Sequence, residues 1–241
     1  MWIASPRGSA RRSGTLAGIL AVAAILGGCA KASAAGGNNA SARTAAPALA
    51  ALNALPIKGR APLTGYTRQQ FGPAWTDDND DPLGHNGCDT RNDILRRDLT
   101  SIAVKADSSG CVVLTGSLAD PYTGSTIAFT RGVTTSSAIE IDHVVALGDA
   151  WQTGAQQLTS RQRTDLGNDP LNLLAVSGSQ NESKGDADSA SWLPPNKSYR
   201  CAYVARQVAV KARYHLWVTA AEHDAIARIL ASCPDQVTPA E

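Results

Sequence analysis

The sequence predicts an α+β fold built as one compact domain, and three observations carry this prediction. Residues 111–118 and 125–130 are β-branched and apolar and are separated by turn-forming residues, which favours a β-hairpin. Residues 139–145 begin by alternating apolar and polar side chains, as a half-buried strand does. The C-terminal third instead repeats its apolar residues at helical spacing, which predicts a helical cap on this core.

The N-terminus has the features of a bacterial export signal. Arg7, Arg11 and Arg12 precede an apolar run at 16–26. That run is too short for an ordinary membrane-spanning helix, which needs about 20 apolar residues. We therefore predict that residues 1–28 are a signal peptide that is removed during export.

The end of this signal predicts a lipid anchor. Leu26-Gly27-Gly28-Cys29 resembles the lipobox of bacterial lipoproteins, in which the Cys becomes the lipid-modified N-terminus. The alternative is a plain secretory signal that is cut in the Ala-rich stretch after Cys29. In either case we expect the chain outside the cytoplasm, secreted or lipid-anchored to the outer face of the bacterial cell membrane.

Composition separates a tether from a folded domain. Residues 29–54 are mostly small and polar and are predicted to form a flexible tether, whereas residues 55–235 are long enough for one domain with its own core. The chain has 22 basic and 21 acidic residues, and without residues 1–28 the balance becomes 19 to 21, a formal charge of −2. Any nucleic-acid function must therefore depend on a local site with a cation and not on a strongly basic surface.

Five cysteines fit an oxidising compartment. If Cys29 is lipidated, Cys88, Cys111, Cys201 and Cys233 remain as an even set, which permits three pairings. We favour Cys88–Cys111 and Cys201–Cys233 because each pair is local and brackets a plausible structural unit. A zinc site is the competing use, but no Cys-x-x-Cys or His-x-Cys spacing is present.

The remaining elements follow from local signals. We predict helices at 66–72, 90–99, 147–153 and 159–166, a strand at 172–176, and two C-terminal helices around 203–216 and 221–230. The polar residues 177–184 are predicted as a loop that leads into a helix. The acidic segment 75–82 superficially resembles a calcium loop but lacks the required Gly and distal Glu, so it is predicted as an ordinary loop.

One set of residues suggests chemistry. His143 is one of only four histidines and stands beside Asp142 at the end of a predicted strand. A lone Asp-His pair is weak evidence, because a strand histidine is more often a core or surface residue. The pair gains meaning from Asn172 and Asn181, which follow it at spacings that suit one site.

At these residues the chain resembles His-Asn-His endonucleases of the ββα-metal (His-Me finger) fold, in particular the C-terminal domain of GmrSD-type restriction endonucleases and its secreted branch. The resemblance covers most of residues 87–233. It is carried by the segments Gly87 to Arg91, Ile141 to Leu147, Asp149-Ala150-Trp151, Asn168 to Leu173, Asn181 to Asp186 and Trp192 to Pro195. It implies a ββα-metal nuclease core and hydrolysis of phosphodiester bonds in DNA, with RNA as the alternative substrate.

The resemblance also implies a role for each residue of the set. His143 is the expected general base, because a neutral imidazole can accept the proton of a water molecule. Asp142 and Asn181 are the expected ligands of a divalent metal, and Asn172 is expected to organise the backbone that holds the base. Asn181 stands where the family name has a His, which favours Mg²⁺ or Mn²⁺ over Zn²⁺.

Three further residues have weaker claims. Lys184 lies three residues after Asn181 and would contact a substrate phosphate if the segment is helical, or else be solvated. Arg91 would hold a phosphate or pair with a nearby acid. Glu140 shares a strand face with Asp142 and would be a metal ligand or a partner of one.

Two other functions compete with the nuclease. The first is a non-catalytic envelope lipoprotein that reuses the fold to bind nucleic acid or the envelope, but a pure binder has no need to combine a base with metal ligands. A Ser or Cys hydrolase lacks the Gly-x-Ser-x-Gly elbow, and the cysteines already have a use.

Overall fold

The computed structural model describes residues 46–239. The predicted signal peptide, the lipidation of Cys29 and most of the tether lie outside these residues. The helices of the described part are α1 (Ala48–Asn53), α2 (Thr90–Asp98), α3 (Leu147–Gln152), α4 (Ser160–Asn168), α5 (Gly178–Lys184), α6 (Arg200–Arg213) and α7 (Ala220–Leu230). Its strands are β1 (Leu99–Val104), β2 (Val113–Ala119), β3 (Thr126–Thr130), β4 (Ile139–His143) and β5 (Leu173–Ser177). The predicted α+β class is confirmed.

Residues 46–239 also contain four short 3-10 helices: η1 (Arg68–Phe71), η2 (Ser136–Ala138), η3 (Ala155–Gln157) and η4 (Lys197–Tyr199). η1 takes the place of the helix predicted at 66–72. Within residues 46–239, no helix is long and apolar enough to cross a membrane.

The predicted hairpin is the antiparallel pair β2–β3, and β1 joins it to form a three-stranded sheet in the order β1-β2-β3. β1 was not predicted from the sequence. Only its first residue, Leu99, is buried, so the strand has no alternating pattern. α2 leads directly into β1. Its N-cap is Asp89, whose side chain accepts a hydrogen bond from the backbone N–H of Asn92.

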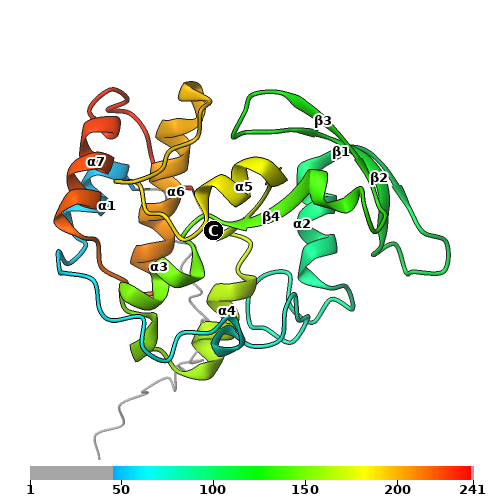
Figure 1. Cartoon of the computed structure of the whole chain (residues 1–241), viewed down its shortest axis with the longest axis horizontal. Coiled ribbons are helices and arrows are strands. Elements are labelled where there is room, and N and C mark those ends of the chain that lie inside the picture. Colours follow the sequence, from blue (N-terminus) through cyan, green and yellow to red (C-terminus); the bar gives the residue numbers. More distant parts are fainter. Residues whose placement is uncertain (1–45, 240–241) are drawn as a thin grey trace, which may run out of the picture. The chain divides into compact units, whose positions relative to one another are not determined.

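The second sheet consists of β4 and β5, which pair antiparallel with His143 opposite Leu173. It is buried on both faces. Ile141 and Leu173 belong to the core cluster that includes α2 and the three-stranded sheet, whereas Leu174 and Val176 belong to the cluster that includes α1, α6 and α7. Figure 1 shows β4 running between these two groups of elements.

The segment after β5 corrects one prediction. Residues 178–184 are not a loop but helix α5 itself, which follows β5 directly and contacts both β4 and β5. Its sequence is polar because only Gly178 and Lys184 are buried, so the helix has almost no apolar face to reveal it. Gly178 is required at its start, since a Cβ atom there would lie 2.0 Å from the carbonyl oxygen of Ser137.

The C-terminal helices α6 and α7 pack against α1, so the folded unit begins earlier in the chain than the sequence predicted. Ala48 and Leu52 of α1 are fully buried against α6 and α7, so the predicted tether ends before residue 48 and not at 54. The sequence of α1 is rich in Ala and is short, so nothing in its composition distinguishes it from the tether. The predicted helix pair is confirmed.

Both predicted disulfides are present. Cys88–Cys111 joins the residue before the cap of α2 to the approach of β2, and Cys201–Cys233 joins the first turn of α6 to the chain beyond α7.

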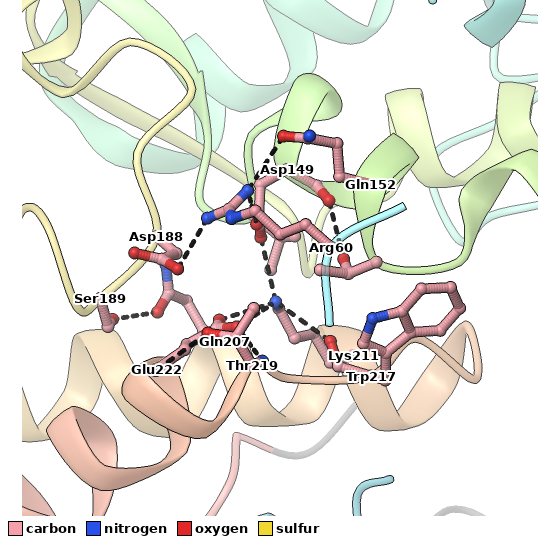
Figure 2. A network of polar contacts seen from close by, with 12 residues as sticks. Arg60, Asp149, Gln152, Asp188, Ser189, Gln207, Lys211, Trp217, Thr219 and Glu222 are labelled. Atoms are coloured by element: carbon pink, nitrogen blue, oxygen red, sulfur yellow. Dashed lines mark hydrogen bonds and ion pairs between the residues drawn. The ribbon is translucent and has the colours of Figure 1, made fainter. Parts of the chain in front are cut away.

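A buried ionic network connects the helices on the C-terminal side (Figure 2). Lys211 of α6 lies 3.0 Å from Asp149 of α3 and 2.7 Å from Glu222 of α7. Arg60 lies 3.1 Å from Asp149 and 2.7 Å from Asp188. Asp149, Asp188 and Glu222 are also close enough together to suggest a metal site among the described residues, but each of them is already paired with a cation of the protein.

Candidate active site

Three adjoining hollows surround the end of β4. Arg68 lines all three, His143 lines two, and Asn181 lines two, so the hollows form one continuous groove. β4 supplies His143, α5 supplies Asn181, and η1 supplies Arg68. The β4, β5 and α5 succession therefore brings the Asp142-His143 pair and Asn181 to the same groove.

His143 is 9% exposed, and one hydrogen bond determines its tautomer. Its Nε2 lies 2.9 Å from the carbonyl oxygen of Gly167, which follows Leu166 in α4. A carbonyl oxygen only accepts hydrogen bonds, so Nε2 carries the proton. In the neutral imidazole, Nδ1 then retains its lone pair and can accept a proton.

Burial keeps this imidazole neutral. Desolvation lowers the pKa of His143 to about 4, and the positive charges of Arg68 and Lys184 add to this effect, while the hydrogen bond to Gly167 opposes it. The base is therefore unprotonated throughout the neutral pH range.

Asn172 is fully buried and links the two chain segments that form the hydrogen bond between His143 and Gly167. Its Oδ1 accepts from the N–H of Val145 at 2.9 Å, and its Nδ2 donates to the carbonyl oxygens of Val145 and Leu166 at 3.3 and 3.2 Å. Val145 lies two residues after His143, and Leu166 precedes Gly167. The Asn172 amide thus sits where it organises backbone around the histidine and its acceptor.

Trp75 covers the His143 ring. The two rings are stacked with centroids 5.7 Å apart and an interplanar angle of 12°. Trp75 has a left-handed backbone (φ 58°), which costs a bulky residue roughly 1–2 kcal/mol. Hydrogen bonds from Thr90 to the carbonyl oxygens of Trp75 and Thr76 hold this conformation against the start of α2.

Asp142 is buried and is held from two sides. Its Oδ1 lies 2.8 Å from the Nζ of Lys184, and its Oδ2 accepts the hydroxyl of Tyr122. Burial and the Asp142 charge raise the pKa of Tyr122 well above its usual value, so this hydroxyl keeps its proton. Each carboxylate oxygen has a second lone pair, which remains for a further ligand.

Lys184 is not placed as the sequence suggested. It is 2% exposed, and its ammonium group also donates to the carbonyl oxygen of His143 at 2.8 Å. It is therefore neither solvated nor positioned for a substrate phosphate, because tertiary packing turns it toward β4. It ties the end of α5 to the residues of the Asp-His pair.

Oxygen donors line the hollow beside His143. Asp142, Asn181 and Asp186 all face it. The Nδ2 of Asn181 donates to Glu140 at 2.8 Å, which leaves the Oδ1 of Asn181 as the atom for a ligand and makes Glu140 the partner of Asn181. Such a set of hard oxygen donors fits a small divalent cation such as Mg²⁺.

Arginines line the adjoining hollow. Arg68, Arg91 and Arg131 lie there with Glu140 and Asn181. Arg91 donates to the carbonyl oxygen of Ile139 at 3.1 Å. Burial and the nearby positive charge of Arg131 lower the pKa of the Arg91 guanidinium. The two neighbouring cations make this part of the surface suitable for binding an anion.

Several residues of this groove were not predicted from the sequence. Tyr122, Trp75, Arg68 and Arg131 lie far from the motif along the chain, and Gly167 lies directly before the segment Asn168 to Leu173. No local pattern singles them out. Asp186 ends the segment Asn181 to Asp186 that carries the resemblance, but it is one of several polar residues there, and the sequence did not distinguish it from the others.

A buried neutral histidine, hard oxygen donors and an arginine-lined groove together suit the binding and hydrolysis of a phosphodiester. Residues 89–229 match the family described as GmrSD restriction endonucleases, C-terminal domain. The match covers more than half of the chain, so the chain belongs to this nuclease family, as the sequence predicted.

A curated relative also covers most of the chain. An uncharacterized secreted protein of Arthroderma benhamiae is 37% identical over 193 residues, which is 79% of this chain and 86% of that protein. No solved structure matches the chain.

Proposed function

We propose that the protein is a metal-dependent endonuclease that hydrolyses phosphodiester bonds of DNA, and that β4, β5 and α5 form a ββα-metal core. The observation that carries the proposal is the hydrogen bond between His143 and Gly167. It leaves Nδ1 as the free base in a groove that also presents Asn181 and Asp142.

The residues divide the reaction between them. Nδ1 of His143 takes a proton from a water molecule, which then attacks the phosphorus of the scissile diester. Asp142 and Asn181, with Asp186 beside them, would hold a divalent cation, most suitably Mg²⁺, whose positive charge stabilises the phosphate and the departing 3′ oxygen.

Two supporting contacts keep these groups in place. Asn172 holds the backbone around the base, and the Tyr122 and Lys184 contacts fix the Asp142 carboxylate. Arg68 and Arg91 supply positive charge for the phosphates that flank the scissile bond. Because the overall charge is near zero, we expect binding to depend on this local groove and on the metal.

The site of action is proposed to be outside the cytoplasm. The disulfides suit an oxidising compartment, and the relative from Arthroderma benhamiae bears the name of a secreted protein. Lipidation of Cys29 remains part of this proposal and can be tested by mass spectrometry of the exported chain.

The central test replaces the base. We expect His143→Ala to lower plasmid nicking in Mg²⁺ by at least about 100-fold, the scale of a lost general base. His223→Ala makes the same change on α7, away from the groove, and should retain activity. A folded His143→Ala protein that nicks DNA as well as the wild type would refute the assignment, and DNA binding without any cleavage by the wild type would favour a non-catalytic binder.

A further inference from the structure

One of the three hollows around the end of β4, the one beside His143 and Trp75, has no role in the proposed reaction. It has a volume of about 240 Å³ and a mostly apolar wall of Phe71, Gly72, Pro73, Ala74, Trp75 and Leu147. We call it the apolar pocket. Pockets for drug-sized ligands have about 300–1,000 Å³. The apolar pocket is therefore suited to one flat ring system and not to a whole nucleotide.

The pocket is connected to the phosphate side of the groove. Arg68 lines the apolar pocket and both neighbouring hollows, and His143 separates the apolar pocket from the oxygen donors around Asn181. A ligand that spans the two hollows would combine an apolar ring with an anionic group. A nucleotide within a DNA strand has this combination.

We propose that the apolar pocket binds one unpaired nucleobase of the DNA strand whose phosphate lies at His143. This inference rests on the proposed nuclease function. The partly exposed Trp75 ring at the pocket wall offers a sequence-tolerant surface for a base. The pocket takes one ring system, and a base that is paired and stacked within a duplex must leave the helix to enter it, at the cost of its pairing and stacking. The site therefore favours single-stranded or bulged DNA over a perfect duplex.

The test compares four oligonucleotides of one sequence with the full-length, disulfide-bonded protein in Mg²⁺. They are a single strand, a perfect duplex, a duplex with one bulged nucleotide, and the same bulge with an abasic residue. Loss of one base–aromatic contact corresponds to about fivefold or more in affinity. We expect the bulge and the single strand to be cut at least about fivefold faster than the duplex, and the abasic bulge to lose this advantage.

A pocket-filling variant gives a second readout. Ala74 is exposed at the pocket wall, so Ala74→Leu narrows the pocket with little effect on the core and should bring the bulge-to-duplex rate ratio toward one. Ala103→Leu makes the same change on exposed β1 and should keep the wild-type ratio.

The outcomes separate this inference from the proposed function. Equal cleavage of all four substrates would overturn the nucleobase pocket and leave the nuclease intact. If no substrate is cut, the nuclease proposal fails, and the pocket is judged by binding alone. Fluorescence anisotropy with the wild-type protein should then show tighter binding of the bulge than of the abasic bulge, and equal affinities would overturn the pocket as well.

Discussion

At His143, a single backbone contact decides which nitrogen can act. The carbonyl oxygen of Gly167 holds the proton on Nε2, and burial keeps the ring neutral. Asn172 supports the contact from Val145 on one side and Leu166 on the other. The chemistry of this residue therefore depends on the end of α4 and on Asn172, which directly precedes β5, as much as on the histidine itself.

The low pKa of His143 predicts the pH dependence of activity. Protonation removes the base, so kcat/KM should stay level from pH 8 to about 5 and fall with a midpoint near the pKa of about 4. An NMR titration of the imidazole should give the same midpoint. An acidic limb centred near 6.5, the ordinary histidine value, would contradict the buried neutral base.

The same shift affects stability, with a definite sign. The folded-state pKa of His143 lies below the unfolded value of about 6.5, so the unfolded chain takes up the proton first. His143 should therefore cost the folded state stability as the pH falls from about 6.5 to 4. His143→Ala should weaken this part of the pH dependence in urea unfolding experiments.

At the scale of elements, α5 is bound to the β4–β5 sheet by polar contacts because it has almost no apolar face. Lys184 at its end pairs with Asp142, and Asn181 in its middle donates to Glu140, both on β4. The short helix therefore depends on the very strand that carries His143. Its two contacts set the position of Asn181 relative to the base.

Removal of the Lys184 charge should destabilise the protein strongly. Lys184→Met leaves the buried Asp142 carboxylate without its cation, and breaking a buried ion pair in this way typically costs about 3–5 kcal/mol. Urea unfolding measures the change. Lys197→Met removes an exposed cation on η4 and should change the stability by less than about 0.5 kcal/mol. Equal effects of the two variants would show that the Lys184 pair is not a buried constraint.

At the scale of the whole described unit, the β4–β5 sheet joins two cores, and each side has its own disulfide. Cys88–Cys111 holds the α2 side, and Cys201–Cys233 holds the α6–α7 side. The ionic network of Lys211 adds a polar connection among α3, α6 and α7 (Figure 2). The groove lies at this sheet; the α2 side contributes Arg91 to it, whereas none of its lining residues comes from α1, α6 or α7.

The C-terminal disulfide should contribute stability without taking part in chemistry. It spans 32 residues, and constraining a loop of this length in the unfolded chain is worth roughly 3–4 kcal/mol. The double variant Cys201→Ser/Cys233→Ser should lose about this much in urea unfolding but keep its kcat/KM at temperatures where it is folded. A large loss of activity in the folded variant would instead link this disulfide to the groove.

The sequence by itself determined the elements with strong local signals. The β2–β3 hairpin, the strand that ends in Asp142-His143, the C-terminal helix pair and both disulfides follow from periodicity, turn residues and cysteine spacing. The family follows from ordered motifs. Such signals lie within short stretches of chain and can be recognised without knowledge of the fold.

Only the tertiary structure decided how these parts act on one another. The contact of His143 with Gly167, the stacking of Trp75 and the pairing of Lys184 with Asp142 join residues 24, 68 and 42 positions apart. Long-range packing also turned Lys184 inward, made residues 178–184 a helix and drew α1 into the core. Contacts of this kind depend on the way distant segments meet, and local residue patterns carry no information about that meeting.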